Sequence, residues 1–304
     1  MKDSIFYRQA NLVLDILPLI AKFDSFALKG GTTINYFIRD LPRLSVDIDL
    51  TYLPIEDRPT TLDSIHSILD VLSKEITDTI SPSSITPKLN KTNQKIERLV
   101  IERSGVTIKI EPNLIIRGSV YPPVEMTLVP AAYKFFEKSV RVQTLSLEDL
   151  YGGKICAALD RQHPRDLFDI KMLFDNEGIT DKIRTAFIVY LISHNRPMNE
   201  LLNPTFQDIS HQFKIEFENM MFNRITLDEL NHARKELVTR LMSDLTEPEK
   251  QFLVSVKSKK PRWDLIEVEH IKDLPAVKWK LLNLEKMDKE SHEEALTKLI
   301  RIFE

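Results

Sequence analysis

Two aspartates one residue apart, Asp47 and Asp49, are the side chains in this sequence whose type and spacing most directly suggest chemistry. Polar and apolar residues alternate over positions 44–50, which predicts a half-buried strand with both carboxylates and Ser45 on one face. Carboxylates about 7 Å apart on such a strand repel each other and resist losing water. Mg²⁺ relieves that cost, because it binds one or two carboxylates and completes its shell with water and phosphate oxygens. For this strand alone, a solvated sheet face is the alternative interpretation.

A glycine pair before this strand suggests a phosphate contact. The apolar run 26–28 ends at Lys29, and Gly30-Gly31 then makes a turn that leads into a helix. The N-terminus of a helix offers unbonded N–H groups and a positive dipole end, which suit a nucleotide phosphate, and the Thr32 hydroxyl could join them. Glycine pairs also mark ordinary turns, so it is their combination with the two aspartates that predicts one phosphate–metal site.

A second group of ionisable residues lies between positions 154 and 169. Lys154 and Arg161 are two helical turns apart and share a helix face, and Asp166 and Asp169 are three apart and neighbour each other. The flanking pattern is apolar, so these charges either form surface ion pairs or belong to a site together with the aspartates of the first half of the chain.

The elements that must position these residues follow from periodicity and turn signals in the first half of the chain. Apolar residues at helical spacing predict helices, and alternating or apolar runs between turn residues predict strands. The predicted helices lie within 1–25, after the glycine pair and at 60–79; the strands lie at 26–28, 44–50, 96–103 and 106–111, with one or two more in 114–130.

The second half of the chain is predicted to be helical. A capping box at Ser146 begins a helix that runs through Arg161, and Pro164 begins the next. Gly152-Gly153 inside the first of these helices costs about 1 kcal/mol per glycine, which indicates close backbone packing, against a nucleotide or a strand. Further helices are predicted at 183–191, 206–221, 227–241 and 247–256.

Composition limits the classes of protein to consider. The chain has 304 residues with 42% hydrophobic and 29% charged side chains, as in a soluble globular protein. No apolar run is long enough to cross a membrane, and the N-terminal segment does not resemble a signal peptide. The single cysteine, Cys156, excludes an internal disulfide and fits a cytoplasmic protein. The formal net charge of −3 excludes a globally basic nucleic-acid coat, so any contact with RNA needs a local patch.

Two basic segments could form such a patch. One carries Lys257, Lys259, Lys260 and Arg262 beside Trp263; the other carries His232, Arg234, Lys235 and Arg240. Cations next to an aromatic ring suit phosphate contact and base stacking, although a solvated basic face has the same composition.

These motifs together resemble those of the polymerase-β-type nucleotidyltransferases. Gly30-Gly31-Thr32 followed by positions 43–50 is similar to their first motif. Within that superfamily the chain resembles the AbiEii/AbiGii toxin family, which includes the MenT toxins. Positions 154–161 and 165–170 match that family's Lys-Leu-x-Ala-x-x-x-Arg and Arg-Asp-x-x-Asp-Leu motifs, and 245–265 resembles its closing segment.

The resemblance implies an α+β fold: a polymerase-β-like domain, a mixed sheet flanked by helices, over 1–145, and a mainly helical domain over 146–304 that contributes Lys154 and Asp169 to the active site. Asp47 and Asp49 would hold Mg²⁺, with Glu111 as a third ligand from a neighbouring strand.

The resemblance also implies roles for the other site residues. Gly30, Gly31 and Thr32 would contact the triphosphate of an NTP, and Lys154 and Arg161 would neutralise its charge. Asp169 would orient Lys154 or act as base, and Asp166 would pair with Arg165 or Arg161. Ser45 would be a position that can receive phosphate.

The function implied is that of an NTP- and Mg²⁺-dependent toxin of a toxin–antitoxin or phage-defence pair. Its expected partner is an antitoxin protein, and no association with a membrane is expected. Members of the family add nucleotides to the 3′ end of tRNA and block translation. Two alternatives stay open: the same site could modify a protein or small-molecule hydroxyl, or the fold could be a catalytically idle module that binds RNA or the antitoxin.

Overall fold

A computed structural model describes residues 2–304 of the chain. The chain divides into two compact units, each described here by itself. The first contains the residues up to Ser146 together with Met220–Arg224, and the second contains Leu147–Asn219 and Ile225–Glu304. The single boundary predicted between residues 145 and 146 does not include the return of Met220–Arg224 to the first unit.

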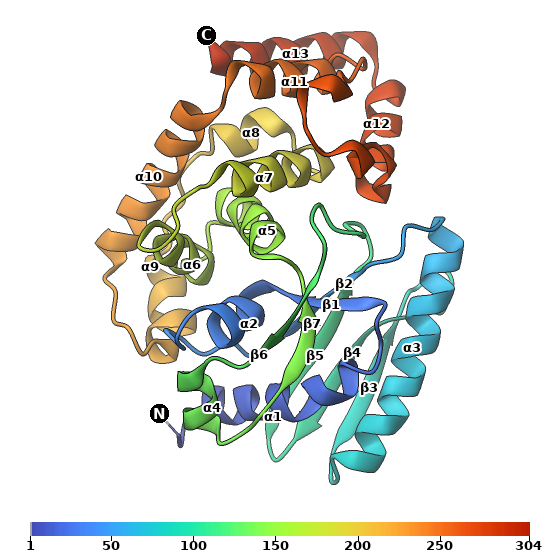
Figure 1. Cartoon of the computed structure of the whole chain (residues 1–304), viewed down its shortest axis with the longest axis vertical. Coiled ribbons are helices and arrows are strands. Elements are labelled where there is room, and N and C mark those ends of the chain that lie inside the picture. Colours follow the sequence, from blue (N-terminus) through green and yellow to red (C-terminus); the bar gives the residue numbers. More distant parts are fainter. Residues whose placement is uncertain (1) are drawn as a thin grey trace. The chain divides into compact units, whose positions relative to one another are not determined.

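A seven-stranded mixed sheet forms the centre of the first unit, with the strand order β3-β4-β5-β2-β1-β7-β6 (Figure 1). β2 lies between β5, to which it is parallel, and β1, to which it is antiparallel. The strands are β1 Phe26–Lys29, β2 Ile48–Tyr52, β3 Ser84–Leu89, β4 Ile96–Arg103, β5 Val106–Asn113, β6 Val124–Thr127 and β7 Arg141–Thr144. The predicted hairpin of β4 and β5 is confirmed, whereas β7 was not predicted.

The helices of the first unit include two long ones that pack on this sheet. α1 (Ile5–Ile20) contacts β5 and β7, and α3 (Arg58–Thr79) contacts β4, because both bury the apolar stripes predicted from the sequence. The shorter helices are α2 (Gly30–Thr33), which continues as a π-helical turn Ile34–Ile38, and α4 (Pro130–Phe136), which was not predicted.

The strand predicted at 44–50 begins only at Ile48, so Asp47 immediately precedes it. The Tyr36 hydroxyl is the physical reason, because it accepts a hydrogen bond from the Ser45 amide (2.7 Å) and donates one to the Ser45 carbonyl (2.6 Å). These backbone groups are therefore not available to a strand ladder. Burial still alternates over 46–50, with Asp47 and Asp49 more exposed than their apolar neighbours, as predicted.

The second unit consists of helices. They are α5 Leu147–Asp160, α6 Pro164–Phe174, α7 Asp181–Ser193, α8 Met198–Leu202, α9 Ser210–Gln212, α10 Leu227–Asp244, α11 Glu247–Lys257, α12 Pro275–Lys286 and α13 Lys289–Phe303, with short π- and 3₁₀-turns between some of them. The predicted helices at 183–191, 227–241 and 247–256 are confirmed within α7, α10 and α11. Between residues 2 and 304, none of the helices combines the length and the hydropathy that a membrane crossing requires.

Gly152 lies where α5 crosses α7. A Cβ at this position would come within 2.8 Å of the Ala186 carbonyl carbon and of the Phe187 amide nitrogen. The close backbone packing predicted for Gly152-Gly153 is therefore present. The neighbour of Gly152 is another helix, however, and the expected nucleotide or strand was wrong for this residue.

The helix crossing predicts a large difference between two adjacent glycine substitutions. Gly152→Ala should lower the free energy of unfolding by about 1–3 kcal/mol, because the new methyl group meets backbone atoms of α7 that cannot move aside. In Gly153→Ala the nearest neighbour is the Tyr190 ring at 3.3 Å, so the better helix propensity of alanine should offset the contact. Urea unfolding of both variants measures the difference; equal stabilities would contradict this packing.

Candidate active site

A row of three charged residues crosses the centre of the sheet. Lys29 on β1 pairs in register with Asp49 on β2, and Asp49 pairs in register with Glu111 on β5. Residues opposite each other on neighbouring strands point to the same face of the sheet. The strand register therefore gathers a lysine and two carboxylates that come from distant parts of the sequence.

Asp49 is the carboxylate of this row with the most open surroundings. It is half-buried, and within residues 2–304 no hydrogen bond or ion pair engages its carboxylate. Gly30 lies against it, and a Cβ at Gly30 would come within 2.6 Å of the Asp49 Oδ2 atom. Gly30 also has a φ of +75°, a left-handed conformation that favours glycine. Only glycine leaves this carboxylate room on that side.

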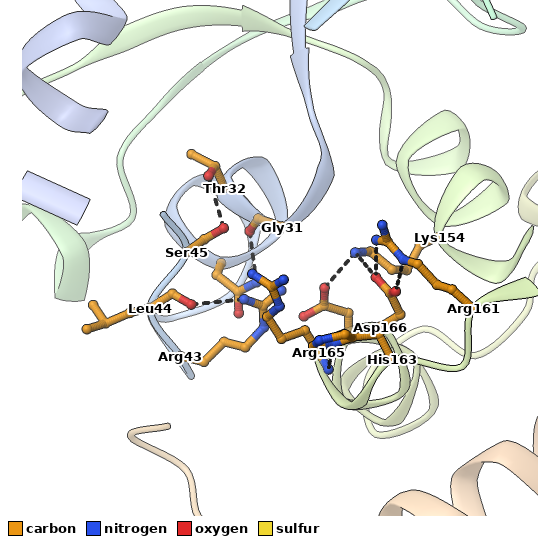
Figure 2. A network of polar contacts seen from close by, with 12 residues as sticks. Gly31, Thr32, Arg43, Leu44, Ser45, Lys154, Arg161, His163, Arg165 and Asp166 are labelled. Carbon is orange, nitrogen blue, oxygen red and sulfur yellow. Dashed lines mark hydrogen bonds and ion pairs between the residues drawn. The ribbon is translucent and has the colours of Figure 1, made fainter. Parts of the chain in front are cut away.

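The hydroxyls of Thr32 and Ser45 lie in a buried network around the backbone of Asp47 (Figure 2). The Thr32 Oγ1 atom lies 2.6 Å from the Asp47 carbonyl oxygen, to which it donates, and 3.0 Å from the Ser45 Oγ atom. Thr32 and Ser45 are buried, at 1% and 6% exposure. Because its hydroxyl is engaged, Thr32 fixes the segment that presents Asp47 rather than offering an open hydroxyl.

Arg43 holds the same loop from its other side. Its guanidinium donates from Nη1 to the Leu44 carbonyl oxygen (2.9 Å), and the residue is only 2% exposed. A Cβ at Gly31 would come within 2.6 Å of the Arg43 Nη2 atom, so the absence of a side chain at Gly31 leaves room for the Arg43 guanidinium. The backbone of Arg43 also pairs with Met221, from the segment that returns to the first unit.

Glu111, the predicted third metal ligand, has a cation of its own. Its carboxylate pairs with the Arg98 guanidinium on the neighbouring strand β4 at 2.9 Å. Across the part of the chain that the structure describes, no three histidine, cysteine, aspartate or glutamate side chains are grouped closely enough to hold a metal ion. Asp47, Asp49 and Glu111 are therefore not assembled as a ligand triad in this conformation.

Lys154, Asp166 and Asp169 form a buried ion-pair cluster in the second unit. Figure 2 labels Lys154 and Asp166 of this cluster, together with Arg161. The Lys154 Nζ atom lies 2.8 Å from Asp166 Oδ1 and 3.0 Å from Asp169 Oδ2, and the exposed fractions are 7%, 1% and 0% in that order. α5 supplies the lysine and α6 supplies both carboxylates, one turn apart. Two buried carboxylates thus share one lysine between two helices.

Arg161 completes this cluster from its exposed side. Its guanidinium donates to both oxygens of Asp166, at 2.5 and 3.0 Å, while 63% of its own side chain stays exposed. Of the two arginines considered from the sequence as partners of Asp166, Arg161 makes this bidentate contact. Burial alone would raise the pKa of the Asp166 carboxyl, but the charge of Lys154 and the hydrogen bonds from Arg161 outweigh it and hold the pKa well below its ordinary value.

The predicted site residues thus occur in two groups, one in each unit. The first group contains Gly30, Gly31, Thr32, Ser45, Asp47 and Asp49; the second contains Lys154, Arg161, Asp166 and Asp169. Sequence reasoning missed Lys29, Tyr36 and Arg43 as members of the first group. Lys29 directly precedes the glycine pair, so its position was a usable signal, whereas no local pattern marks the contact of Tyr36 with Ser45.

Cys156 has no part in either group. It is buried in α5, and burial strongly raises the pKa of its thiol, so it is not a nucleophile.

Two comparisons with known proteins found a match, one with a family model and one with a solved structure. The family model described as nucleotidyl transferase AbiEii toxin of a type IV toxin–antitoxin system matches residues 12–280. Among solved structures, the chain is similar to MenT4, a nucleotidyltransferase toxin from Mycobacterium tuberculosis H37Rv. That match has a TM-score of 0.61 and 13% identity, and it covers 97% of this chain and 92% of the other. It confirms the predicted α+β nucleotidyltransferase fold. No sequence among curated proteins matches the chain.

Removing the lysine from the buried cluster should be costly. Lys154→Met removes the cation that Asp166 and Asp169 share, and breaking a buried ion pair typically costs about 3–5 kcal/mol of stability. The loss should be largest at pH 7 and smaller at pH 5, because the pKa of a buried carboxyl rises when a neighbouring cation is removed and protonation then removes the carboxylate charge. Urea unfolding at the two pH values measures this.

Lys171→Met is the matched control, since it breaks an ion pair with Asp175 on the outside of α6, where a pair contributes about 1 kcal/mol or less. Equal losses in the two variants, independent of pH, would contradict a charged buried cluster.

Proposed function

This chain belongs to the AbiEii family of nucleotidyl transferase toxins, and on that premise we propose that it transfers a nucleoside monophosphate from an NTP to an RNA acceptor. It is therefore a nucleotidyltransferase and the toxin of a type IV toxin–antitoxin system, a class that has an antitoxin partner. The acceptor that we propose is the 3′ end of a tRNA, whose modification would block translation in the cytoplasm. The proposal rests mainly on Asp49, a half-buried carboxylate that lies beside a glycine turn and has no hydrogen bond or ion pair with the side chains described between residues 2 and 304.

The donor set of the first unit fits Mg²⁺. This ion takes one or two carboxylates and fills its remaining positions with water and phosphate oxygens. Asp47 and Asp49 are adjacent on one face, and the missing side chain of Gly30 leaves space at the Asp49 Oδ2 atom. In our proposal these two aspartates hold the ion, which when bound neutralises charge on the triphosphate. Glu111 could serve as a third ligand only after it leaves Arg98.

The glycine turn is proposed to bind the triphosphate through the backbone of Gly30, Gly31 and Thr32. The Thr32 hydroxyl is committed to the Asp47 carbonyl oxygen, so Thr32 acts as a positioning residue and contacts phosphate only through its amide. Ser45 has the same supporting role, because it is 6% exposed and Tyr36 holds its backbone. A phosphate added to the Ser45 hydroxyl would disrupt this network and thereby displace the segment that presents Asp47.

Lys154 is proposed to neutralise charge on the β- and γ-phosphates, with Arg161 as a more exposed helper. Of the two roles considered for Asp169, orienting Lys154 is favoured over acting as base. Its carboxylate lies 3.0 Å from the Lys154 Nζ atom and is completely buried, so an acceptor hydroxyl has no path to it in this conformation. Asp166 supports Lys154 in the same way and fixes Arg161.

The transfer itself breaks the phosphoanhydride bond between the α- and β-phosphates of the NTP and forms a phosphodiester bond to the acceptor. The acceptor hydroxyl oxygen attacks the α-phosphorus, the bond from that phosphorus to the bridging oxygen breaks, pyrophosphate leaves and the hydroxyl proton is lost to solvent. The protein contributes position and charge stabilisation.

The central test supplies each labelled NTP with Mg²⁺ and total RNA, and then separates RNA, protein and small molecules. We expect label in RNA, and a loss of roughly 100-fold or more in Asp49→Asn, because that change removes a ligand charge. Glu125→Gln, an exposed change on β6, is the control and should keep the wild-type rate. Wild-type transfer by Asp49→Asn would contradict the proposed site, and label only in protein or in a small hydroxyl compound would contradict the proposed acceptor.

A pair of glycine substitutions tests the space beside Asp49. Gly30→Ala and Gly105→Ala both place alanine at a φ near +75°, so both should lose about 1–2 kcal/mol of stability. Only Gly30→Ala also pushes a methyl group against the Asp49 Oδ2 atom, since nothing lies within 4 Å of a Cβ at Gly105. Transfer should therefore be lost in Gly30→Ala and retained in Gly105→Ala when both are assayed well below their melting temperatures. Full activity in both variants would show that the turn does not shape the site.

A further inference from the structure

The two basic segments noted in the sequence differ in what the fold does with them. In the segment on α10, the Arg234 guanidinium donates to Gln162 Oε1 and to the Gln207 carbonyl oxygen, both at 2.8 Å, and Arg240 pairs with Glu236. Arg234 thus fixes α10 to the segments that contain Gln162 and Gln207, and Arg240 is paired within α10. The segment at the end of α11 is different, and it leads to a second site.

Lys257 is the last residue of α11, and it is 7% exposed. Its carbonyl oxygen lies 2.7 Å from the His292 Nε2 atom on α13, so its backbone is fixed between two helices. Within residues 2–304 its ammonium has no hydrogen bond or ion pair, yet the Nζ atom is not completely enclosed. The stem of this lysine is thus packed in the protein while its charge reaches solvent.

Two further lysines gather near Lys257. Lys280 on α12 is half-buried, and its Nζ atom donates to the carbonyl oxygens of His194 (2.6 Å) and Arg196 (3.2 Å), just beyond the C-terminus of α7. Lys259 follows α11 with a φ of +63°, a conformation uncommon outside glycine, and its Nζ atom lies 3.5 Å from the Met287 carbonyl oxygen. We call Lys257, Lys259 and Lys280 the lysine cluster; Figure 1 shows the helices α7, α11 and α12 that carry or border it.

The lysine cluster has no compensating carboxylate. Among the described side chains, none of the acidic residues forms an ion pair with any of its three lysines. Burial, together with the charge of Lys257, lowers the pKa of Lys280 to about 8, and burial together with the charge of Lys259 lowers the pKa of Lys257. Like charges held together without an anion cost stability, and a bound anion would recover it.

A chain of contacts at the end of α5 connects the lysine cluster to Arg161, which we assign to the nucleotide. Arg196, whose carbonyl accepts from Lys280, donates from its guanidinium to Asp160 at 2.8 Å. Asp160 is the last residue of α5, and the next residue is Arg161 of the Lys154–Asp166 cluster. A long polyanion that reaches Arg161 could therefore continue toward the lysine cluster within the same unit.

We propose that the lysine cluster binds a backbone phosphate of the RNA acceptor. The proposal rests on the proposed function, since it assigns this RNA a second contact away from the end that is modified. Three lysine ammoniums supply point charges without base-specific geometry, which suits a backbone phosphate and explains how the acceptor is held independently of its sequence.

The test uses the full-length protein and a fluorescently labelled tRNA fraction without NTP, with binding measured by anisotropy over a range of salt concentrations. Lys257→Met keeps the apolar stem and removes the charge. We expect affinity at low salt to fall about tenfold, the equivalent of one charged hydrogen bond, and the salt slope to decrease by about one. The melting temperature should stay the same or rise, because repulsion within the cluster is relieved; a purely structural lysine would lower it.

Lys182→Met is the matched control, since Lys182 is an exposed lysine at the other end of α7. It should leave affinity and salt slope unchanged. RNA binding by Lys257→Met that equals that of Lys182→Met and of the wild type would overturn the proposal, as would a wild-type protein that does not bind RNA.

A second arm distinguishes the source of the phosphate and separates this proposal from the proposed function. If Lys257→Met loses the thermal stabilisation by an NTP and keeps its RNA affinity, the phosphate belongs to a nucleotide and the RNA assignment is overturned. A wild type that labels RNA but binds it without Lys257 overturns the cluster alone. A wild type that binds RNA through Lys257 but labels only protein or small hydroxyl compounds overturns the proposed function alone.

Discussion

Charge held inside the protein must be compensated, and this constraint explains the arrangement of each group of functional residues. Asp166 and Asp169 lie in the interior of the helical unit, where two carboxylates alone would be very unfavourable, and Lys154 compensates both, with help from Arg161. Among the residues that the structure describes, Asp49 has no such partner, which is the property that a magnesium ligand needs. The lysine cluster presents the opposite case, cations without an anion, and fits a phosphate. Incomplete compensation thus distinguishes Asp49 and the lysine cluster, whereas in the compensated cluster Asp166 and Asp169 position Lys154 and Arg161.

The support behind these groups is built from distant parts of the chain. In the first unit, Tyr36 holds the backbone of Ser45, Thr32 holds that of Asp47, and the segment Met220–Arg224 pairs with the residues that precede them. The aspartates therefore stand on a segment that is fixed from several sides before any ligand arrives. In the second unit, the contact of Gly152 with α7 fixes α5, the helix that carries Lys154. Substitutions far from the charged groups should consequently alter function through the placement of these segments.

The sequence predicted those features that depend on local pattern. Alternation predicted that Asp47 and Asp49 lie on one face. Helical spacing predicted that Lys154 and Arg161 share one face of a helix and that Asp166 and Asp169 are neighbours on another helix. Features that depend on which elements become neighbours could not be predicted. The proximity of Glu111 to Arg98 requires the register of β4 and β5, and the late start of the predicted 44–50 strand, at Ile48, depends on one hydroxyl nine positions from Ser45. Likewise, Arg234 and Lys257 both look like basic surface residues in the sequence. Only the tertiary fold shows that the Arg234 guanidinium is hydrogen-bonded to Gln162, whereas the Lys257 ammonium has no hydrogen bond or ion pair among residues 2–304.

We propose that Asp49 and Lys154 both stabilise the transition state of nucleotidyl transfer, and the account depends most on this claim. A double-mutant cycle on the single-turnover rate of nucleotidyl transfer tests it most directly, with Asp49→Asn and Lys154→Arg, each confirmed to be folded. Groups that act as a unit are strongly non-additive, so the account predicts that the double variant is hardly slower than the slower single variant. A double variant whose rate loss equals the product of the two single losses would contradict the claim, because the two residues would then act independently.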